Sequence, residues 1–308
     1  MRGDGPTSHA VRRGASGARF GLSRELHASA DLTLGRFECP EGHVLWDQDN
    51  QTGELAVFAI PGPGVEIRMA GRPAVVAHPG CVMLYEPRQV YARRRLDARG
   101  DVCTYVGVAS ATLRAALAER DPAAADREAL FAGPRAPLAA ADYLAVTRTV
   151  RALERGAERL AAGEAVAAIV ARLIDGVASA EARAGAPGER HRVLALALER
   201  RLIDRFTADD DLAALADAVG ASPFHAARVF RACTGASLHA YRNHLRLCAA
   251  LERLAAPRCD LTALALELGY SSHSHFTTAF RRAFGCPPSA ARGPLGAPLR
   301  RSARRARS

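Results

Sequence analysis

The chain of 308 residues contains no lysine, so all 42 of its basic side chains are arginines. It has no run of 18 or more apolar residues, which excludes a membrane-spanning helix from the expected structure. Its first 30 residues lack the apolar stretch of a secretory signal, and its seven cysteines are far apart, without a paired C-x-x-C. These absences predict a cytoplasmic protein with free thiols, no disulfide framework and no membrane partner.

Hydrophobic residues make up 49% of the sequence and charged residues 24%. This balance supplies enough apolar surface to offset the entropy lost on folding, which excludes a mainly disordered chain. A length of 308 residues is long for one domain and suits two.

The net charge of +10 is concentrated in the second part of the chain. Residues 191–308 contain 18 arginines and nine acidic residues, a net charge of +9, whereas residues 1–190 have a net charge of +1. Codon bias explains why arginine replaces lysine, but it does not explain this asymmetry. A neutral domain joined to a cationic one predicts that the cationic domain binds a polyanion.

Short apolar runs broken by glycine and proline fill the region from Leu32 to Ala109. Many short strands at regular spacing are typical of a β-sandwich or a β-barrel. The expected strands are Leu32–Cys39, Glu54–Ile60, Gly64–Ala70, Ala74–Ala77, Gly80–Tyr85, Gln89–Arg95 and Val102–Ala109.

Helical spacing begins at Ser110 and predicts helices over Ser110–Arg120, Leu138–Leu160 and Glu164–Glu181. In the last of these, apolar residues at spacings of three and four form one stripe. They are Val166, Ile169, Val170, Leu173 and Val177. Such a stripe packs within its own domain or forms the seam of a dimer, and its spacing is compatible with both. The small residues at 184–188 predict the domain boundary.

The cationic part contains an internal repeat, in which residues 211–220 are echoed by residues 260–269. Each copy begins with Asp-Leu, continues with apolar residues at helical spacing and ends with a glycine. Gly220 and Gly269 stand where a helix ends with a positive φ angle. Each copy therefore predicts a short helix followed by a tight turn.

A second helix is expected after each turn, with Ser222 and Ser272 as its N-caps. A proline at the first helical position strengthens the signal after Ser222. One long helix, expected over Ser237–Ala255, joins the two copies. A helix, a glycine turn and a second helix form a helix-turn-helix motif, so the sequence predicts two such units.

From Leu212 to Arg292 the sequence resembles the DNA-binding domain of the AraC/XylS transcription regulators. The matching motifs are Ser222-Pro-Phe-His, Arg228-Val-Phe-Arg, Thr234-Gly, Tyr241, Arg246-Leu, Leu264-Ala, Leu268-Gly-Tyr-Ser-Ser, Ser274-His-Phe, Phe280-Arg, Phe284-Gly and Pro287-Pro. The resemblance implies that the second helix of each unit enters a major groove. Two such helices on one chain read segments about one helical turn, or about 34 Å, apart.

Helical spacing separates the outward side chains of the two reading helices from their apolar faces. The expected base contacts are Phe224, His225, Ala227 and Arg228 in the first unit and His273, Ser274, Thr277 and Thr278 in the second. Arg228 suits a bidentate contact to guanine, although a salt bridge or a phosphate contact is the alternative. Thr278 takes the corresponding place in the second unit, which leaves base readout there in question. The expected phosphate contacts are Arg231, Arg242, Arg246, Arg281 and Arg282.

The β-rich region resembles, more weakly, the cupin-like barrel often joined to this DNA-binding domain. The matching residues are Phe58, Gly64, Gly71-Arg72, Val75-Val76-Ala77, Tyr91, Gly100-Asp101 and Cys103. In the family such barrels bind an effector or support dimerisation. A metal-dependent cupin needs several histidines and a glutamate on neighbouring strands, and this pattern is missing.

Two groups of side chains nevertheless raise the question of a metal. Cys39, His43, Cys81 and Cys103 form a zinc site if their strands converge, and are otherwise buried thiols beside an exposed histidine. His273 and His275 lie two positions apart on a helix and point in nearly opposite directions, so one ion does not reach both. No metal or cofactor is therefore expected.

The sequence predicts a two-domain α+β protein with a cupin-like β-barrel, flanking helices and an all-α domain of two helix-turn-helix units. The expected divisions are a disordered leader (1–24), the sensing barrel (25–110), a helical dimerisation or linker segment (111–188), the DNA-binding domain (189–292) and a disordered basic tail (293–308).

The expected function is sequence-specific DNA binding by an effector-responsive transcription activator that is not an enzyme. Its expected partners are double-stranded DNA, RNA polymerase and a second copy of the chain, with an unknown small molecule as effector. One alternative is a cupin-type metal enzyme with an accessory nucleic-acid-binding module. Another is a nonspecific nucleoid binder that acts through charge alone.

Overall fold

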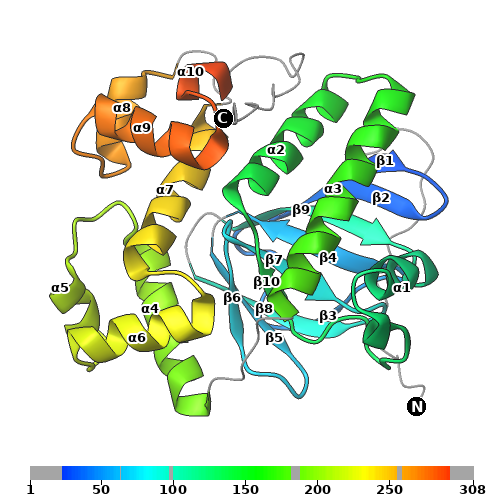
Figure 1. Cartoon of the computed structure of the whole chain (residues 1–308), viewed down its shortest axis with the longest axis horizontal. Helices are drawn as coiled ribbons and strands as arrows, with labels where there is room; N and C mark the ends of the chain where they lie inside the picture. The colour runs from blue at the N-terminus through cyan, green and yellow to red at the C-terminus, as the bar shows by residue number, and fades with distance from the viewer. Residues whose placement is uncertain (1–22, 63, 97–99, 182–187, 255–258, 292–308) are drawn as a thin grey trace, which may run out of the picture.

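The computed structural model describes residues 23–62, 64–96, 100–181, 188–254 and 259–291. We call residues 23–181 the front half and residues 188–291 the back half. Figure 1 shows the strands of the front half beside the helices of the back half. The expected leader, the boundary stretch and the basic tail lie almost entirely outside the described residues.

The described part of the front half contains two antiparallel sheets. One sheet has the order β1 (Ser23–Ala28), β2 (Leu32–Cys39), β9 (Asp101–Val108), β4 (Ala56–Pro61), β7 (Cys81–Tyr85) and β10 (Arg135–Pro137). The other has the order β3 (Asp49–Gln51), β8 (Val90–Arg95), β5 (Val65–Met69) and β6 (Val75–Ala77). Among the described strands none of one sheet pairs with a strand of the other, so the expected closed barrel is not seen.

All seven expected strands are present, with ends that differ by at most two residues. The strands that sequence reasoning missed are β1, which begins at Ser23 inside the expected leader, and the three-residue strands β3 and β10. The polar β1 is defined by its pairing with β2, and β3 and β10 are too short to show an alternating pattern.

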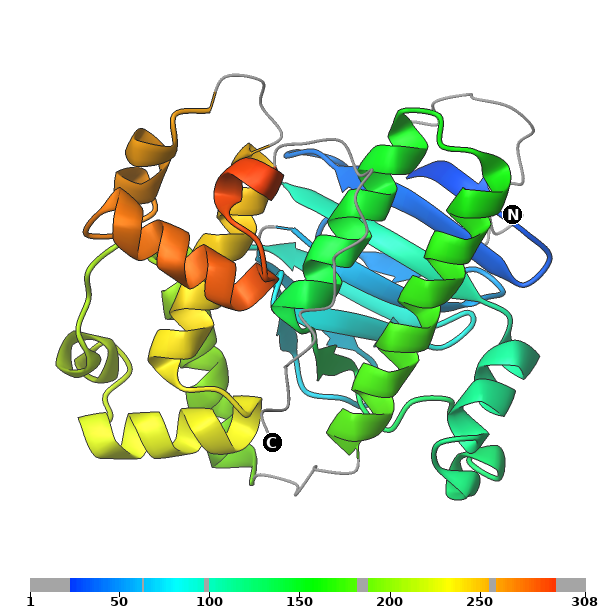
Figure 2. The same cartoon turned by 45° about the horizontal axis from the view of Figure 1, so that its top comes forward.

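The expected helix Leu138–Leu160 is confirmed only in part, because the chain turns at Gly156 with a φ of 82°. The helix α2 (Ala140–Glu154) ends before this turn, and α3 (Arg159–Glu181) contains the whole of the expected helix Glu164–Glu181. They follow α1 (Ser110–Ala118) and a 3-10 turn, η1 (Pro122–Ala125). Figure 2 shows α2 and α3 lying across the larger sheet.

The apolar stripe of α3 is buried against this sheet. Its five residues, from Val166 to Val177, belong to the same core as Phe58 and Val106. The stripe is therefore covered within its own chain, and a dimer seam on these residues is incompatible with this arrangement. A separate apolar cluster that includes Met83 and Tyr85 fills the space between the two sheets.

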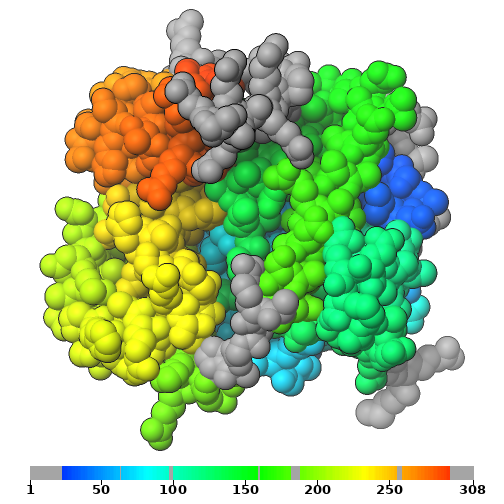
Figure 3. Space-filling view, viewed as in Figure 1, coloured from blue at the N-terminus to red at the C-terminus, as the bar shows by residue number. Residues whose placement is uncertain are grey.

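The back half begins with α4 (Glu189–Asp204). The first helix-turn-helix unit, called unit one, consists of α5 (Leu212–Asp217) and α6 (Pro223–Thr234). The joining helix α7 (Leu238–Arg253) leads to unit two, which consists of α8 (Leu261–Glu267) and α9 (His273–Phe284), and α10 (Pro288–Ala291) follows. In the space-filling view the two units form separate lobes along one side of the molecule (Figure 3). No helix among these residues, or elsewhere in the described chain, is long and apolar enough to span a membrane.

Candidate nucleic-acid interface

The two units use the same local signals to place their helices. Ser222 Oγ accepts a hydrogen bond from His225 N at 3.3 Å, and Ser272 Oγ accepts one from His275 N at 3.1 Å. Each serine thereby satisfies one of the free amides at the start of a reading helix. Gly220 and Gly269 have φ angles of 67° and 80° in the turns. The repeated sequence thus produces two reading helices with the same start.

On α6 the apolar face is buried and most of the expected reading face is accessible. Phe224 is 79% exposed, and Arg228 is also exposed. His225 is half-buried, with its ring 5.9 Å from that of His191 and its Nδ1 3.5 Å from Arg228 Nη2. Ala227 differs from the others because it packs on the edge of the core of unit one. Arg228 and Phe224 are therefore the most prominent side chains of this face.

On α9 the three phenylalanines of the helix form the buried face. Phe276, Phe280 and Phe284 stack in series, with ring centroids 5.7 and 4.5 Å apart. The opposite face is polar, and His273, Ser274 and Thr278 are exposed while Thr277 is half-buried. This arrangement holds α9 by an apolar ladder and leaves its polar face accessible.

The polar face of α9 contains a shallow hollow of about 320 Å³. Its lining residues are Thr277, Thr278, Arg281 and Arg282. The hydroxyl groups and guanidinium groups of two expected contact sets therefore share one surface. Such a surface suits an anionic ligand, because guanidinium is a planar donor that matches phosphate oxygens.

The exposed arginines of the two reading helices have no carboxylate partner among the described residues. They are Arg228, Arg231, Arg281 and Arg282. Many arginines of the front half, by contrast, form ion pairs, such as Arg88 with Glu54 and Arg120 with Asp175. The uncompensated charge thus faces outward on α6 and α9.

Arg246 corrects the expected phosphate contacts, because this side chain is only 8% exposed. Its guanidinium donates to the carbonyl oxygens of Phe206 at 2.6 Å, Ala208 at 2.9 Å and Gly269 at 2.8 Å. It also lies over the ring of Tyr270, 5.7 Å from the centroid. Arg246 therefore ties the segment before unit one to the turn of unit two and is not available to DNA.

Arg242 is one helical turn before Arg246 on α7 and also contacts the backbone before unit one. Its Nη1 donates to Asp210 O at 2.5 Å and to Ala208 O at 3.5 Å, and the side chain is half-buried. Two backbone carbonyls therefore already occupy one end of its guanidinium. This placement favours a structural role for Arg242 over the expected phosphate contact.

Residues 215–293 match a protein family described as helix-turn-helix domain. Two curated relatives are the virulence regulon transcriptional activator VirF of Yersinia enterocolitica and the thermoregulatory protein LcrF of Yersinia pestis. Each is 38% identical to this chain over 64 residues, which is 21% of this chain and 24% of the relative. Residues 215–293 are an AraC-type helix-turn-helix domain. The match spans about a quarter of the length of these relatives.

Two solved structures with a similar chain are also on record. A probable AraC family transcriptional regulator from Rhodopseudomonas palustris is 26% identical, covers 32% of this chain and 94% of its own, and has a TM-score of 0.30. ToxT from Vibrio cholerae is 7% identical, covers 87% of this chain and 99% of its own, and has a TM-score of 0.35.

The AraC-type domain also contains supporting residues that sequence reasoning missed. Asp211 Oδ1 accepts from Ala214 N, and Asp260 Oδ1 accepts from Thr262 N, each at 2.8 Å. These aspartates cap the first helix of each unit. The repeated Asp-Leu dipeptide was a usable signal for them, because aspartate is a favoured N-cap.

The front half shows no metal site among its described residues. No group of three or more histidine, cysteine or acidic side chains with the geometry of a metal site occurs in the described chain. All seven cysteines are free thiols, with Cys39 and Cys81 buried and Cys103 partly buried. His43 instead accepts a hydrogen bond from Leu45 N through Nδ1. The four residues that raised the question of zinc are thus not brought together.

Proposed function

We propose that the protein is a sequence-specific DNA-binding transcription regulator, with α6 and α9 as its two reading helices. The observation that carries this proposal is the duplicated unit whose two capped helices each present an accessible polar face with uncompensated arginines. Arginine supplies both bidentate contacts to guanine and contacts to phosphate. Charge alone would favour nonspecific binding, but the two units add a defined geometry.

Within this function we assign the contacts by position. Phe224, His225 and Arg228 face base edges from α6, and Ala227 stands at the edge of that surface. His273, Ser274, Thr277 and Thr278 form the corresponding surface of α9. Arg231, Arg281 and Arg282 contact phosphate, whereas Arg246 supports the fold of the domain through its hydrogen bonds to backbone carbonyls.

Footprinting with the full chain tests this function. A specific regulator protects two adjacent major-groove segments about 34 Å apart, in the presence of excess unrelated DNA. Arg228→Ala weakens binding at one base pair of the site, whereas Arg155→Ala is a matched control, since Arg155 is an exposed arginine of the front half. Equal affinity for every sequence would leave only nonspecific binding by charge.

We further propose that residues 25–110 form a cupin-like sensing domain, with residues 111–188 as a helical linker and residues 189–292 as the DNA-binding domain. The two facing sheets with an apolar interior support the first assignment. We place the protein in the cytoplasm, with an unknown small molecule as effector. Its action on transcription is activation through RNA polymerase.

Two measurements test these finer assignments. Transcription in vitro from a promoter that carries the footprinted site rises with added protein if the regulator is an activator and falls if it is a repressor. Light scattering of the full chain tests the proposed homodimer, whose seam lies outside the buried stripe of α3. A monomer at high protein concentration with and without DNA would refute the dimer alone.

A further inference from the structure

The first helix of the back half lies against the outer face of the smaller sheet. Val76 of β6 shares one apolar cluster with Leu198, Leu202 and Ile203 of α4. The approach is close at Gly64, where an added Cβ atom would lie 2.4 Å from Ile203 Cγ2. Only glycine permits this contact, so the sheet and α4 form a fitted seam.

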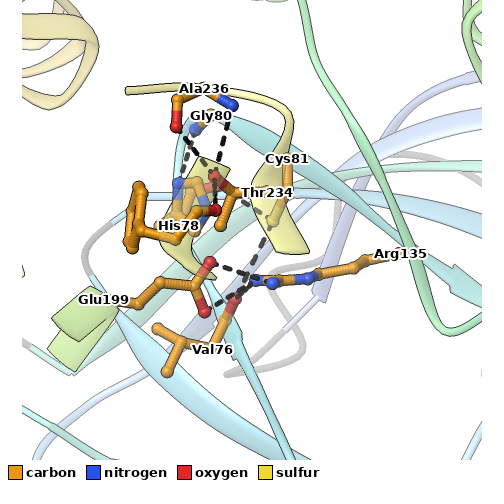
Figure 4. A network of polar contacts seen from close by, with 9 residues as sticks. Val76, His78, Gly80, Cys81, Arg135, Glu199, Thr234 and Ala236 are labelled. Atoms are coloured by element: carbon orange, nitrogen blue, oxygen red, sulfur yellow. Dashed lines mark hydrogen bonds and ion pairs between the residues drawn. The ribbon is translucent and has the colours of Figure 1, made fainter. Parts of the chain in front are cut away.

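Two consecutive residues of α4 form ion pairs of opposite sense with the front half, one with the larger sheet and one with the smaller sheet. Glu199 accepts two hydrogen bonds from Arg135 of β10, at 2.9 Å and 3.2 Å. Figure 4 shows the Arg135 guanidinium between this carboxylate and the carbonyl oxygen of Val76, to which it also donates at 2.9 Å. The next residue, Arg200, pairs with Glu66 of β5, which also pairs with Arg68 and Arg94 of the same sheet.

The carboxylates of both pairs are buried, with Glu199 1% and Glu66 2% exposed. A buried carboxylate that loses its partner is strongly disfavoured, and among the described ion pairs Arg135 is the partner of Glu199. The acid-base order at 199 and 200 therefore matches a single placement of α4 against the two sheets of the front half. We call these four residues the α4 latch.

The joining helix α7 and unit two lie against a different part of the front half, the helix α2. Arg151 Nη2 donates to Leu251 O at 2.7 Å, and Tyr143 Oη donates to Glu252 Oε1 at 3.2 Å. The apolar residues of α2 share a core cluster with those of α7 and α9. Helices α2 and α9 lie side by side in both ribbon views (Figures 1 and 2). This second contact depends on apolar packing and hydrogen bonds more than on ion pairs.

We infer that the front half holds the two units at separate points and thereby sets the distance and angle between their reading helices. The inference rests on the proposed DNA-binding function. Unit one follows α4 because α4 packs against α6, with the ring of His191 beside that of His225. The front half leaves Phe224, Arg228, His273 and Thr278, four of the expected base contacts, exposed. The residues of the α4 latch are positioning residues for DNA recognition.

The test measures how binding depends on the spacing of the two half-sites. DNA duplexes carry the footprinted site as found, or with one or two base pairs inserted between the two protected segments. The full-chain proteins are wild type, Glu199→Gln, Arg135→Glu, Glu199→Arg and the double exchange of Arg135→Glu with Glu199→Arg. Arg155→Glu serves as the charge-reversal control on an exposed position of the front half. Circular dichroism confirms that each protein is folded.

Wild type and Arg155→Glu are expected to bind the inserted duplexes at least tenfold more weakly than the natural site. Glu199→Gln and the single reversals are expected to reduce this ratio at least threefold, and the double exchange is expected to restore it. Glu199→Gln keeps the volume of the side chain and decides the matter if the reversals do not fold.

Three outcomes are distinct. Wild type that binds its site with equal affinity at every spacing overturns the inference but not the proposed function. Folded Glu199→Gln with the spacing ratio of wild type overturns it as well. Wild type without any preferred site removes the proposed function itself.

Discussion

Replacing Arg246 with methionine separates a structural role from a phosphate contact. Methionine keeps a long side chain but removes every donor of the guanidinium. In the folded domain three carbonyl oxygens lie 2.6–2.9 Å from this group, and a fourth, of Thr207, lies at 3.5 Å. Three of the four carbonyls belong to half-buried residues. The substitution therefore leaves several acceptors without their donor.

The size of the effect follows from these contacts. A hydrogen bond from a charged donor contributes about 1.5–3 kcal/mol to the free energy of unfolding. Burial, and then the neighbouring Arg242, lowers the pKa of Arg246, so part of this gain is offset by removing the guanidinium from water. Water also reaches the freed carbonyl of Thr207, which is exposed. A net loss of about 3 kcal/mol is expected for Arg246→Met.

Denaturant unfolding and salt-dependent DNA binding form the assay. If Arg246 has a structural role, the unfolding midpoint of Arg246→Met falls, and the folded variant keeps the wild-type dependence of DNA affinity on salt. Arg246→Lys keeps the charge but not the planar fork of donors, so most of the stabilisation that Arg246 provides is lost in this variant too. An unchanged unfolding midpoint together with a salt slope of binding reduced by about 0.9 would refute the structural role and show that Arg246 contacts phosphate.

Three further predictions concern the turn at Gly269, the second reading helix and His78, which directly follows β6. Gly269→Ala is expected to lower the free energy of unfolding by more than about 2 kcal/mol, because the added Cβ would lie 2.3 Å from a carbonyl oxygen at a φ of 80°. Gly220→Ala is the control, since open space surrounds Gly220 and only backbone strain is added there. Equal losses of stability in urea unfolding would contradict this prediction. Arg281→Ala is expected to lower the salt slope of binding by about 0.9 without loss of sequence preference, and a slope equal to that of wild type would exclude a phosphate contact. Burial, and then Arg135, lowers the pKa of His78 well below 6.5, so the folded state holds this ring neutral while the unfolded state takes up a proton. The free energy of unfolding is therefore expected to fall as the pH drops below about 6.5, and that of His78→Gln is expected to fall less. If the stability of the two proteins changed in parallel with pH, this role of His78 would be ruled out.

The helix-turn-helix units could be predicted because their signals are local. The glycines of the turns and the serines at positions 222 and 272 act through backbone conformation and through amides three residues away. The apolar positions of α9 repeat at helical spacing, and the structure buries the phenylalanines there. A short window of sequence therefore contains all of the information that places these helices.

The residues of the interface itself were only partly predictable. Arg246 and Arg281 look alike in the sequence, since both are arginines on amphipathic helices. Arg246 is buried because the segment 206–208 and the turn at Gly269 converge on it from both sides in sequence. Arg281 stays exposed because no such segment covers that face of α9 among the described residues. Contacts between distant segments cannot be read from helical spacing.

The sequence by itself determined the two-part organisation, the cationic character of the second part and the pair of capped reading helices, because charge and capping depend on nearby residues. Only the tertiary structure decided which arginines remain available to a ligand, that the stripe of α3 is covered by its own sheet, and that α4 is held by paired charges on β5 and β10. Those outcomes depend on which surfaces meet, and burial turns a side chain that could bind a partner into one that holds the fold.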